Sequence, residues 1–448
     1  MLRNIWTHGL VLTAVLMLLL AGCDENDSSN TAAGGRGPAA QGNSASAEQV
    51  TIHMMHSWPA DSSPQQYRLV TQIVEAYEQE HPNVNIKQEV LENEQYKNKL
   101  KVLSASNELP DVGITWAAGF IEPYVKGDLF APLDDILGGE QLKDKFVAGT
   151  TEAYKVDGIT YALPIELNIC PVYYNKDIFE RYDLQVPSTY EEFKEVVKTL
   201  ADAGVAPIAL GNKDRWTGSI WYMYLADRLA GSETLSKATS AAVSFDDPGL
   251  IRAAAEVQNL VNMKAFNPGY NGLSNEEGKL EFTDEKAAMY LTGTWELPNF
   301  TANPDIPQEF KDKVGFFKFP TVDGGKGDIN SWVGGPGVGL FVAEASRVEE
   351  EAKAFVEYFV SHWGEASVTT AGVIPATKVD TSDSRLPQLY VQLLDELNNA
   401  SSITLYADVQ MKPTAAQVHL DMIQALFGEA VTPEQFAVKN KEAVEKSN

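Results

Sequence analysis

The chain of 448 residues is poor in positive charge. It has 35 lysine and arginine residues against 62 aspartate and glutamate residues, which gives a net charge of -27. So acidic a chain argues against a nucleic-acid partner. It also argues against an anionic lipid or phosphate ligand, because the sequence has no local cluster of basic residues that would hold one.

The motifs of common catalytic and metal sites are also missing. The sequence contains no nucleophile elbow, no phosphate-binding loop and no His-Glu-x-x-His motif. His53 and His56 lie three residues apart on an expected strand, so their rings point to opposite faces, and no third ligand has a helpful spacing. We therefore predict no metal site, no cofactor and no enzymatic activity. A surface glycosidase stays open as an alternative, because Glu166 with a second acid of a cleft would supply the two opposed carboxylates that such an enzyme needs.

The N-terminal segment has the pattern of an export signal. One charge, Arg3, precedes an apolar stretch over residues 10–21, which is too short to span a bilayer comfortably. The stretch ends in Leu-Ala-Gly before Cys23, which resembles the lipobox at which a cysteine is lipidated as the signal is removed. We predict a signal peptide over residues 1–22, lipidation of Cys23, and a flexible tether over residues 23–49 that is rich in small and polar residues.

Cysteine is scarce, with 2 residues in the chain. If Cys23 carries lipid, Cys170 has no partner, so no disulfide framework is expected. Cys170 lies between Ile169 and Pro171 in an apolar context, which favours a buried, unreactive thiol.

The remaining roughly 400 residues exceed the usual size of one hydrophobic core, so we expect two lobes. Over residues 50–116 the hydrophobic spacing predicts strand, helix, strand, helix and strand, the pattern of a parallel doubly wound sheet. Such sheets bind ligands beyond the carboxyl ends of their strands. Trp58 and Trp116 both follow strands that end in this way.

Capping patterns predict where several helices begin. Ser63 and Gln66 stand at the capping-box positions of a helix over residues 64–80. A second capping box is predicted at residues 187–191. A further helix is expected over residues 220–230, and the tail over residues 386–448 is expected to be helices that close the second lobe.

The stretch of residues 158–177 has the features of a chain that crosses between two lobes. It opens with an Asp-Gly turn, which favours a hairpin, and continues into an apolar strand over residues 159–167. Pro164 cannot donate to a sheet, so the strand ends or changes sheet near it. Glu166 and Asn168 then lie on one side of the extended chain.

This stretch, with Pro-Ile-Glu-Leu-Asn followed by Tyr-Asn-Lys-Asp, resembles the first inter-lobe crossover of the extracellular solute-binding proteins of the maltose-binding type. Other motifs resemble the family in the same order: Pro-Asp-Val ahead of Trp116, Gly-Thr-Trp ending at Trp295, the glycine-rich stretch 332–340, and the segment 371–375. The ordered set extends over most of the chain. The resemblance implies a two-lobed α/β fold of the periplasmic-binding-protein type (type II), with three inter-lobe crossovers.

The resemblance also implies lobe boundaries and a function. The N-terminal lobe is expected over residues 50–166 plus 338–371, and the C-terminal lobe over residues 171–332 plus 376–448. Because the family delivers sugars to ABC importers, we expect a monomeric, lipid-anchored receptor on the extracellular or periplasmic side of the membrane. It would close its lobes on a carbohydrate, in our prediction an oligosaccharide, and deliver it to membrane permeases. A receptor of the same fold for a non-sugar solute is the other alternative.

Candidate ligand contacts are aromatic, hydrogen-bonding or glycine residues near strand ends and crossovers. An indole ring packs against the C–H face of a sugar, while amide and carboxylate groups meet its hydroxyls. The candidates are Trp58, Trp116, Glu166, Asn168, Asn212, Trp216, Trp221, Trp295, Trp332 and Gly335. By resemblance, Trp116, Asn168 and Trp295 fall at cleft positions of the family. The maltose-binding protein has a glutamate where this chain has Asn168, so maltose itself is not implied.

Overall fold

The structure is a computed structural model that describes residues 49–381 and 385–447; the predicted signal peptide, Cys23 and nearly all of the tether lie outside these residues. The described residues form two hydrophobic cores. The first draws its buried side chains from residues 52–165 and 340–373 together with Val409, and the second from residues 167–333 and 368–444. We call the parts around these cores the first lobe and the second lobe. The fold is the two-lobed type II arrangement that the sequence predicts.

Five strands form the sheet of the first lobe. Their order is β2 (Val84–Val90), β1 (Val50–His56), β3 (Val112–Trp116), β13 (Val338–Val342) and β6 (Leu163–Pro164). β1 is parallel to β2 and β3, as predicted, whereas β13 is antiparallel to both β3 and β6. The sheet is therefore parallel only in part, because β13 enters it directly from the second lobe without a crossover helix.

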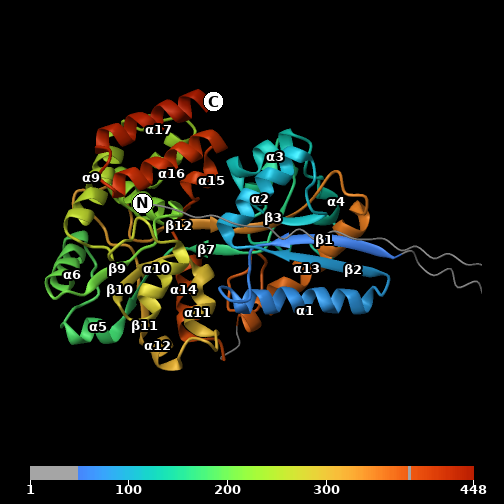
Figure 1. Cartoon of the computed structure of the whole chain (residues 1–448), viewed down its shortest axis with the longest axis horizontal. Helices are drawn as coiled ribbons and strands as arrows, with labels where there is room; N and C mark the ends of the chain where they lie inside the picture. Colours follow the sequence, from blue (N-terminus) through green and yellow to red (C-terminus); the bar gives the residue numbers. More distant parts are fainter. Residues whose placement is uncertain (1–48, 382–384, 448) are drawn as a thin grey trace, which may run out of the picture. The chain divides into compact units, whose positions relative to one another are not determined.

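Helices α1 and α13 pack against each other and against this sheet (Figure 1). The helical segments of the first lobe are α1 (Pro64–Glu80), α2 (Asn93–Ser106), η1 (Ala118–Phe120), α3 (Glu122–Lys126), α4 (Asp134–Leu137), η2 (Glu152–Tyr154), α13 (Glu349–Ala366) and the π-helical turn η4 (Ser367–Ala371). The predicted hairpin is present as β4 (Lys155–Val156) and β5 (Ile159–Thr160), with positive φ at both Asp157 and Gly158 in the turn.

The sheet of the second lobe is also mixed. Its order is β11 (Val314–Phe317), β8 (Val172–Asn175), β10 (Ala287–Leu291) and β9 (Ala206–Ala209). β10 is parallel to β9, and β8 is antiparallel to both of its neighbours. β8 directly follows the first crossover, so it runs into this sheet against the direction of β10.

The helices of the second lobe surround that sheet. They are α5 (Lys176–Arg181), α6 (Tyr190–Asp202), α7 (Trp216–Ala230), α8 (Ser232–Thr239), α9 (Pro248–Asn262), α10 (Asn275–Thr283), η3 (Thr294–Glu296), α11 (Leu297–Thr301), α12 (Gln308–Lys313), α14 (Gln388–Asn398), α15 (Ala407–Gln410), α16 (Pro413–Phe427) and α17 (Pro433–Ser447). α7 begins four residues before the predicted helix start at 220, so Trp216, expected in the preceding loop, is the first residue of the helix.

A small sheet lies at the crossovers, between the helices of the two lobes (Figure 1). Its order is β14 (Ser402–Thr404), β12 (Ser331–Pro336) and β7 (Leu167–Ile169). β14 corrects the prediction that the tail is entirely helical, because three residues added to the edge of β12 are too few to give a period-two pattern. Cys170, beside β7, is buried as predicted, and burial raises the pKa of its thiol to about 12.

The two predicted capping boxes have different outcomes. Thr189 caps α6, with Glu192 as its reciprocal partner, so the second capping box is present but ends one residue beyond the predicted range 187–191. At the start of α1, Ser63 forms no side-chain capping hydrogen bond within the described residues. Gln66 instead donates its side-chain hydrogen bond to the backbone oxygen of Trp295 in the second lobe, at 3.3 Å. An inter-lobe contact therefore takes the place of the predicted local one.

Candidate functional site between the lobes

A cavity of about 790 Å³ lies between residues of both lobes. The first lobe contributes residues after β1 and β3 and on α2, among them Trp58, Lys97 and Trp116. The second lobe contributes the start of α7, the η3 turn and the segment around α15. Trp58 and Trp116 thus lie just beyond the carboxyl ends of parallel strands, where the sheet topology predicts a ligand site.

Glu166 lies where the three crossovers meet. Its backbone oxygen accepts a 2.9 Å hydrogen bond from the N–H of Gly337, next to the second crossover strand. It also forms an antiparallel bridge with Pro375 of the third crossover. The side chain lines the cavity although only 4% of the residue is exposed. The backbone of Glu166 is therefore fixed by contacts with the other two connections between the lobes.

The carboxylate of Glu166 has an unpaired atom. Oε1 is buried and has no hydrogen-bond partner within residues 49–381 and 385–447. Burial raises the pKa of Glu166 to about 7, and a hydrogen bond with Asn168 opposes that rise. A buried oxygen without a partner is costly to the folded protein, so it is a position at which a ligand donor gains binding energy.

Asn168 presents its amide nitrogen toward the same region. Its Oδ1 accepts a 2.9 Å hydrogen bond from the hydroxyl of Thr294, which fixes the orientation of the amide. Its backbone pairs with Gly335 of β12. A Cβ atom at Gly337 would lie 2.5 Å from the Asn168 Nδ2 atom, so only glycine at that position leaves the amide in place. Glu166, Asn168 and Gly337 form one polar wall of the cavity, which we call the crossover wall.

Three aromatic rings of the second lobe form an opposing surface, which we call the aromatic wall. The rings of Trp216 and Trp295 meet edge to face at 5.8 Å, and those of Trp295 and Tyr406 do so at 6.0 Å. All three residues are partly exposed and line the cavity. The indole N–H of Trp216 is buried and lacks an acceptor in the described part of the chain. A Cβ atom at Gly293 would collide with the ring of Trp295, so that glycine makes room for the indole.

Two tryptophans of the first lobe complete the aromatic lining. Trp116 is partly exposed, with Tyr96 and Phe120 packed edge to face against it at 6.0 and 5.1 Å. The ammonium group of Lys97 lies 4.9 Å from its ring centroid. Trp58 is more deeply buried and packs against the ring of Trp363 at 5.6 Å. Trp363 belongs to the core of the first lobe.

Six of the ten predicted ligand contacts therefore line one cavity. They are Trp58, Trp116, Glu166, Asn168, Trp216 and Trp295. They come from separate parts of the sequence and from both lobes. Whether they bind a ligand stays a prediction, but the structure brings them together.

Four predicted contacts do not reach the cavity as the structure describes it. Trp221 is buried within α7 and packs against rings of the second core, including Phe319 at 5.7 Å. Trp332 is buried in β12. Both were placed at the cavity because the sequence put them near strand ends. Helix α7 and strand β12 instead turn these indoles into the core.

Asn212 and Gly335 support the local conformation of the chain instead of lining the cavity. Asn212 is fully buried; its amide donates to Asn271 at 2.7 Å and its oxygen accepts from the N–H of Gly218 at 3.0 Å, which holds the start of α7. Gly335 has a φ of 124°, a conformation that favours glycine, and a Cβ atom there would meet Leu405 at 3.0 Å. The glycine that borders the cavity is Gly337, two residues later.

Acidic residues from both lobes line one end of the cavity, which we call the acidic end. Its acids are Glu92 of the first lobe and Glu276 and Glu296 of the second, and the amide of Asn299 beside them donates to Glu296 at 2.7 Å. Burial raises the pKa of Glu92, and Glu276 and Asp61 raise it further, whereas the Ser62 hydroxyl, donating at 2.8 Å, opposes the rise. The sequence does not predict this group, because Glu92 precedes α2 and Glu276 and Glu296 lie on α10 and η3, and none of these segments has a pattern typical of a cleft.

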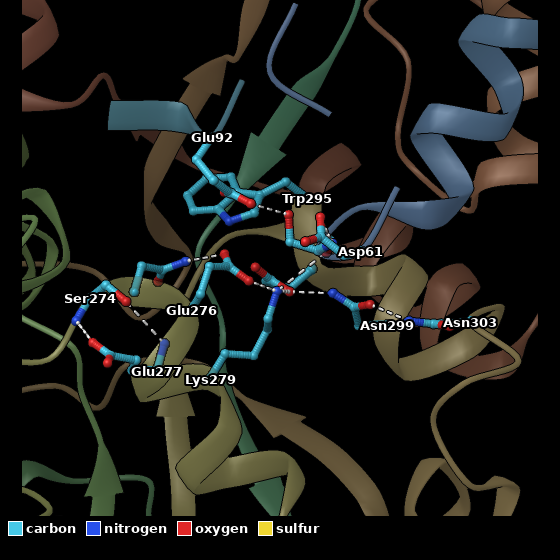
Figure 2. Close-up of polar contacts among 12 residues, drawn as sticks. Asp61, Glu92, Ser274, Glu276, Glu277, Lys279, Trp295, Asn299 and Asn303 are labelled. Atoms are coloured by element: carbon cyan, nitrogen blue, oxygen red, sulfur yellow. Dashed lines mark hydrogen bonds and ion pairs between the residues drawn. The ribbon is translucent and has the colours of Figure 1, made fainter. Parts of the chain in front are cut away.

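Lys279 compensates part of that charge. It forms ion pairs with Glu276 and, at 3.6 Å, with Glu296 (Figure 2). Burial alone would lower the pKa of Lys279, but the two carboxylates raise it above its ordinary value. Figure 2 also shows Asn299 and Asn303 extending this chain of polar contacts away from Lys279.

Direct hydrogen bonds join the lobes beside the cavity. The side chains of Gln65 and Gln66 in α1 donate to the backbone oxygens of Ala302 and Trp295, both at 3.3 Å. Lys279 donates to the backbone oxygen of Ser62 at 3.5 Å. The Gln66 bond ends on the residue whose ring forms the centre of the aromatic wall.

Membrane-spanning and metal-binding features were also sought in the described ranges. None of the helices there is both long and apolar enough to cross a membrane. No group of three His, Cys, Asp or Glu side chains in those ranges is placed to hold a metal ion.

Comparison with known proteins gives consistent matches. Residues 60–365 match the family model of the bacterial extracellular solute-binding proteins. The chain is 24% identical over 298 residues to the multiple sugar-binding protein of Streptococcus mutans. The aligned region covers 64% of this chain and 67% of that protein. It is 22% identical over 420 residues to the melibiose/raffinose/stachyose-binding protein MelE of Bacillus subtilis. The aligned region covers 91% of this chain and 86% of that protein.

The fold has solved counterparts as well. A structure from work on xylan utilization by the thermophilic bacterium Caldanaerobius polysaccharolyticus is 32% identical, with a TM-score of 0.83. The match covers 88% of this chain and 99% of that chain.

Proposed function

Because the chain belongs to the bacterial extracellular solute-binding protein family, we propose that it is the receptor of an ABC importer and binds an oligosaccharide between its two lobes. The relatives named above are sugar-binding proteins, which supports a carbohydrate ligand. The family consists of binding proteins rather than enzymes, which supports a receptor without catalysis.

One observation carries the proposal: the cavity combines aromatic faces with buried, unpartnered polar atoms. Trp216 Nε1 is a donor and Glu166 Oε1 an acceptor, and neither has a partner among the described residues. A saccharide offers C–H faces that pack on indoles and hydroxyls that both donate and accept hydrogen bonds. The volume of about 790 Å³ lies in the upper part of the range of roughly 300–1,000 Å³ for small-molecule sites, which favours an oligosaccharide over one sugar ring.

In this proposal the lobes are residues 50–166 plus 338–371 and residues 171–332 plus 376–448, and the short segments between them form the hinge. A ligand that touches both lobes gains contacts only when they are closed, so it shifts the population toward the closed state. Permease subunits then recognise that closed state. Lipidation of Cys23, which lies outside the described residues, would hold the receptor at the membrane.

A binding screen with a parallel assay for catalysis tests the proposal. Purified protein is mixed with monosaccharides and with xylo-, malto-, cello- and chito-oligosaccharides, and its melting temperature is recorded. We expect at least one oligosaccharide to raise the melting temperature, because a ligand that binds only the folded state stabilises it by mass action. Chromatography of the same mixtures should show unchanged sugar. Binding of none of these sugars would overturn the proposal, and product formation would point to a glycosidase.

A further inference from the structure

The charges that line the cavity are unequal. The acidic lining residues are Glu92, Glu94, Glu166, Glu276, Glu296 and Asp408, and the basic ones are Lys97, Lys101 and Arg215. Burial raises the pKa of Asp408, which lies beside the aromatic wall on α15. The acids occupy four different parts of the lining: the acidic end, the crossover wall, α15, and α2, on which Glu94 lies. A bound ligand therefore meets carboxylates on several sides.

Two of the basic side chains already have acidic partners. Lys97 forms a 2.9 Å ion pair with Glu94 and lies over the ring of Trp116. Arg215 forms a 2.6 Å ion pair with Asp421 of α16. Lys101 is exposed. The charge of each of these two cations is therefore already balanced in part by a carboxylate of the protein.

Glu166 gives this acidic lining a defined contact with a ligand. Glu166 lines the cavity, and its Oε1 atom is buried and lacks a partner in the described residues. A ligand hydroxyl would donate to it. A ligand carboxylate, sulfate or phosphate at the same place has no proton to donate to Oε1. It would also bring a negative charge among the acidic side chains of the lining, in a water-poor site where like charges repel more strongly than in water.

We infer that the cavity selects an uncharged oligosaccharide and excludes saccharides that carry an acidic group, with Glu166 as the residue that enforces the exclusion. The inference rests on the proposed function and specifies the chemical class of its ligand. Its consequence is that an acidic branch on an otherwise suitable oligosaccharide prevents uptake until another reaction, a hydrolysis that removes the acidic sugar, has released the neutral chain.

The test compares ligands that differ in charge. Binding is measured by titration calorimetry for xylotetraose and for xylotriose carrying one 4-O-methylglucuronic acid, and for maltotetraose and maltotetraose oxidised to a uronic acid at one C6. Each acid is also tested as its methyl ester, which keeps the size but removes the charge. We expect the acid of the pair that binds to have a Kd at least about tenfold higher than its neutral counterpart, and the ester to recover most of the loss.

Two variants locate the effect. Glu166→Gln should reduce the difference between acid and neutral sugar to a few-fold. Glu195→Gln, exposed on α6 and away from the cavity, should leave the difference unchanged. Equal Kd values for acid and neutral sugar, or an ester as weak as the acid, would overturn the inference while leaving the receptor proposal intact. An unchanged difference in a folded Glu166→Gln variant would overturn the role of Glu166. Binding of no saccharide at all would instead contradict the proposed function.

Discussion

The hydroxyl of Thr294 donates a 2.9 Å hydrogen bond to Asn168 Oδ1 and accepts a 3.3 Å hydrogen bond from the N–H of Ile169. Thr294 is fully buried in the second lobe, whereas Asn168 belongs to the first crossover. Since Thr294 directly precedes Trp295, one side chain links the crossover wall to the aromatic wall. The hydrogen bond from Thr294 holds the oxygen of the Asn168 amide, and this leaves the amide nitrogen on the side of the cavity.

Thr294→Val should weaken sugar binding by about 1 kcal/mol, because it removes the hydrogen bond that orients Asn168 while keeping the shape of the side chain. Thr294→Ser keeps the hydroxyl and should bind like the wild type. Calorimetry on both variants, on Asn168→Ala and on the double variant separates positioning from general damage. If Thr294 acts through Asn168, the two losses of affinity are not additive. Additive losses would contradict this role.

Trp116→Ala and Trp295→Ala should each weaken binding of an oligosaccharide by roughly 1–3 kcal/mol, the scale of a buried aromatic contact. The two residues belong to different lobes, so both losses are expected only if the ligand touches both. Trp221→Phe is the matched control, because Trp221 lies in the second core, packs on rings that do not line the cavity, and should change the melting temperature rather than the Kd. An unchanged affinity in a folded Trp116→Ala or Trp295→Ala variant would assign that indole to packing.

Glu166→Gln should change how stability depends on pH. Burial raises the pKa of Glu166 from 4.5 to about 7 in the folded protein, so the folded state binds this proton more tightly than the unfolded state. The resulting stability is fully present below pH 4.5 and is lost as the pH rises through 7. Glutamine imitates the protonated acid and avoids that loss. Between pH 4.5 and 8, the free energy of unfolding of the variant relative to wild type should therefore rise by about 3 kcal/mol.

Urea titrations across this pH range measure that difference. Glu195→Gln, an exposed exchange of the same kind, should give a flat difference. A flat profile for Glu166→Gln as well would mean that the Glu166 carboxyl ionises as easily in the folded protein as in the unfolded chain.

Ligand should make the protein more compact in solution. X-ray scattering at saturating oligosaccharide should give a smaller radius of gyration than scattering without it, because the ligand favours closed lobes. A radius that stays constant at saturation would contradict the hinge.

Gln66→Ala removes an inter-lobe hydrogen bond and should weaken binding by roughly 0.5–1.5 kcal/mol. Gln72→Ala changes an exposed residue of the same helix and should leave binding unchanged.

Cys23→Ala should release the protein from the membrane fraction without unfolding it. A single acyl chain anchors a protein only marginally, and a lipidated cysteine would carry two or three, so retention depends on that residue. Fractionation followed by immunoblotting measures the release, and the circular dichroism of the purified variant checks its fold. Retention of the variant in the membrane would indicate that residues 10–21 remain as an uncleaved anchor.

Sequence reasoning located the crossovers and the residues that follow strands. Period-two patterns and proline predict turns and strand ends next to Glu166, Asn168 and Trp295. All three residues line the cavity. Trp221 and Trp332 carry the same local signal, but α7 and β12 direct them into the core. The direction in which a large side chain points depends on the exact helix start or strand register, and these are the parts of a fold that local patterns fix least.

The acidic end and the Gln66 contact were beyond prediction for a different reason. Glu92, Glu276 and Glu296 lie in three separate segments, and only the packing of the two lobes brings them near one another. Gln66 fits a local capping box, yet its amide donates across the lobe boundary. Contacts between distant segments leave no periodicity in either segment, so a single sequence does not reveal them.

The position of β13 determines when the first lobe can assemble. This strand lies between β3 and β6 in the middle of a five-stranded sheet, yet it ends at Val342, long after the other four strands have been made. A nascent chain that stops before Val338 has two sheet edges with no strand to join them. Pairings of such large sequence separation form slowly. The protein is therefore synthesised for most of its length without a complete first lobe, and it gains that lobe only after residues 167–333 of the second lobe have been translated.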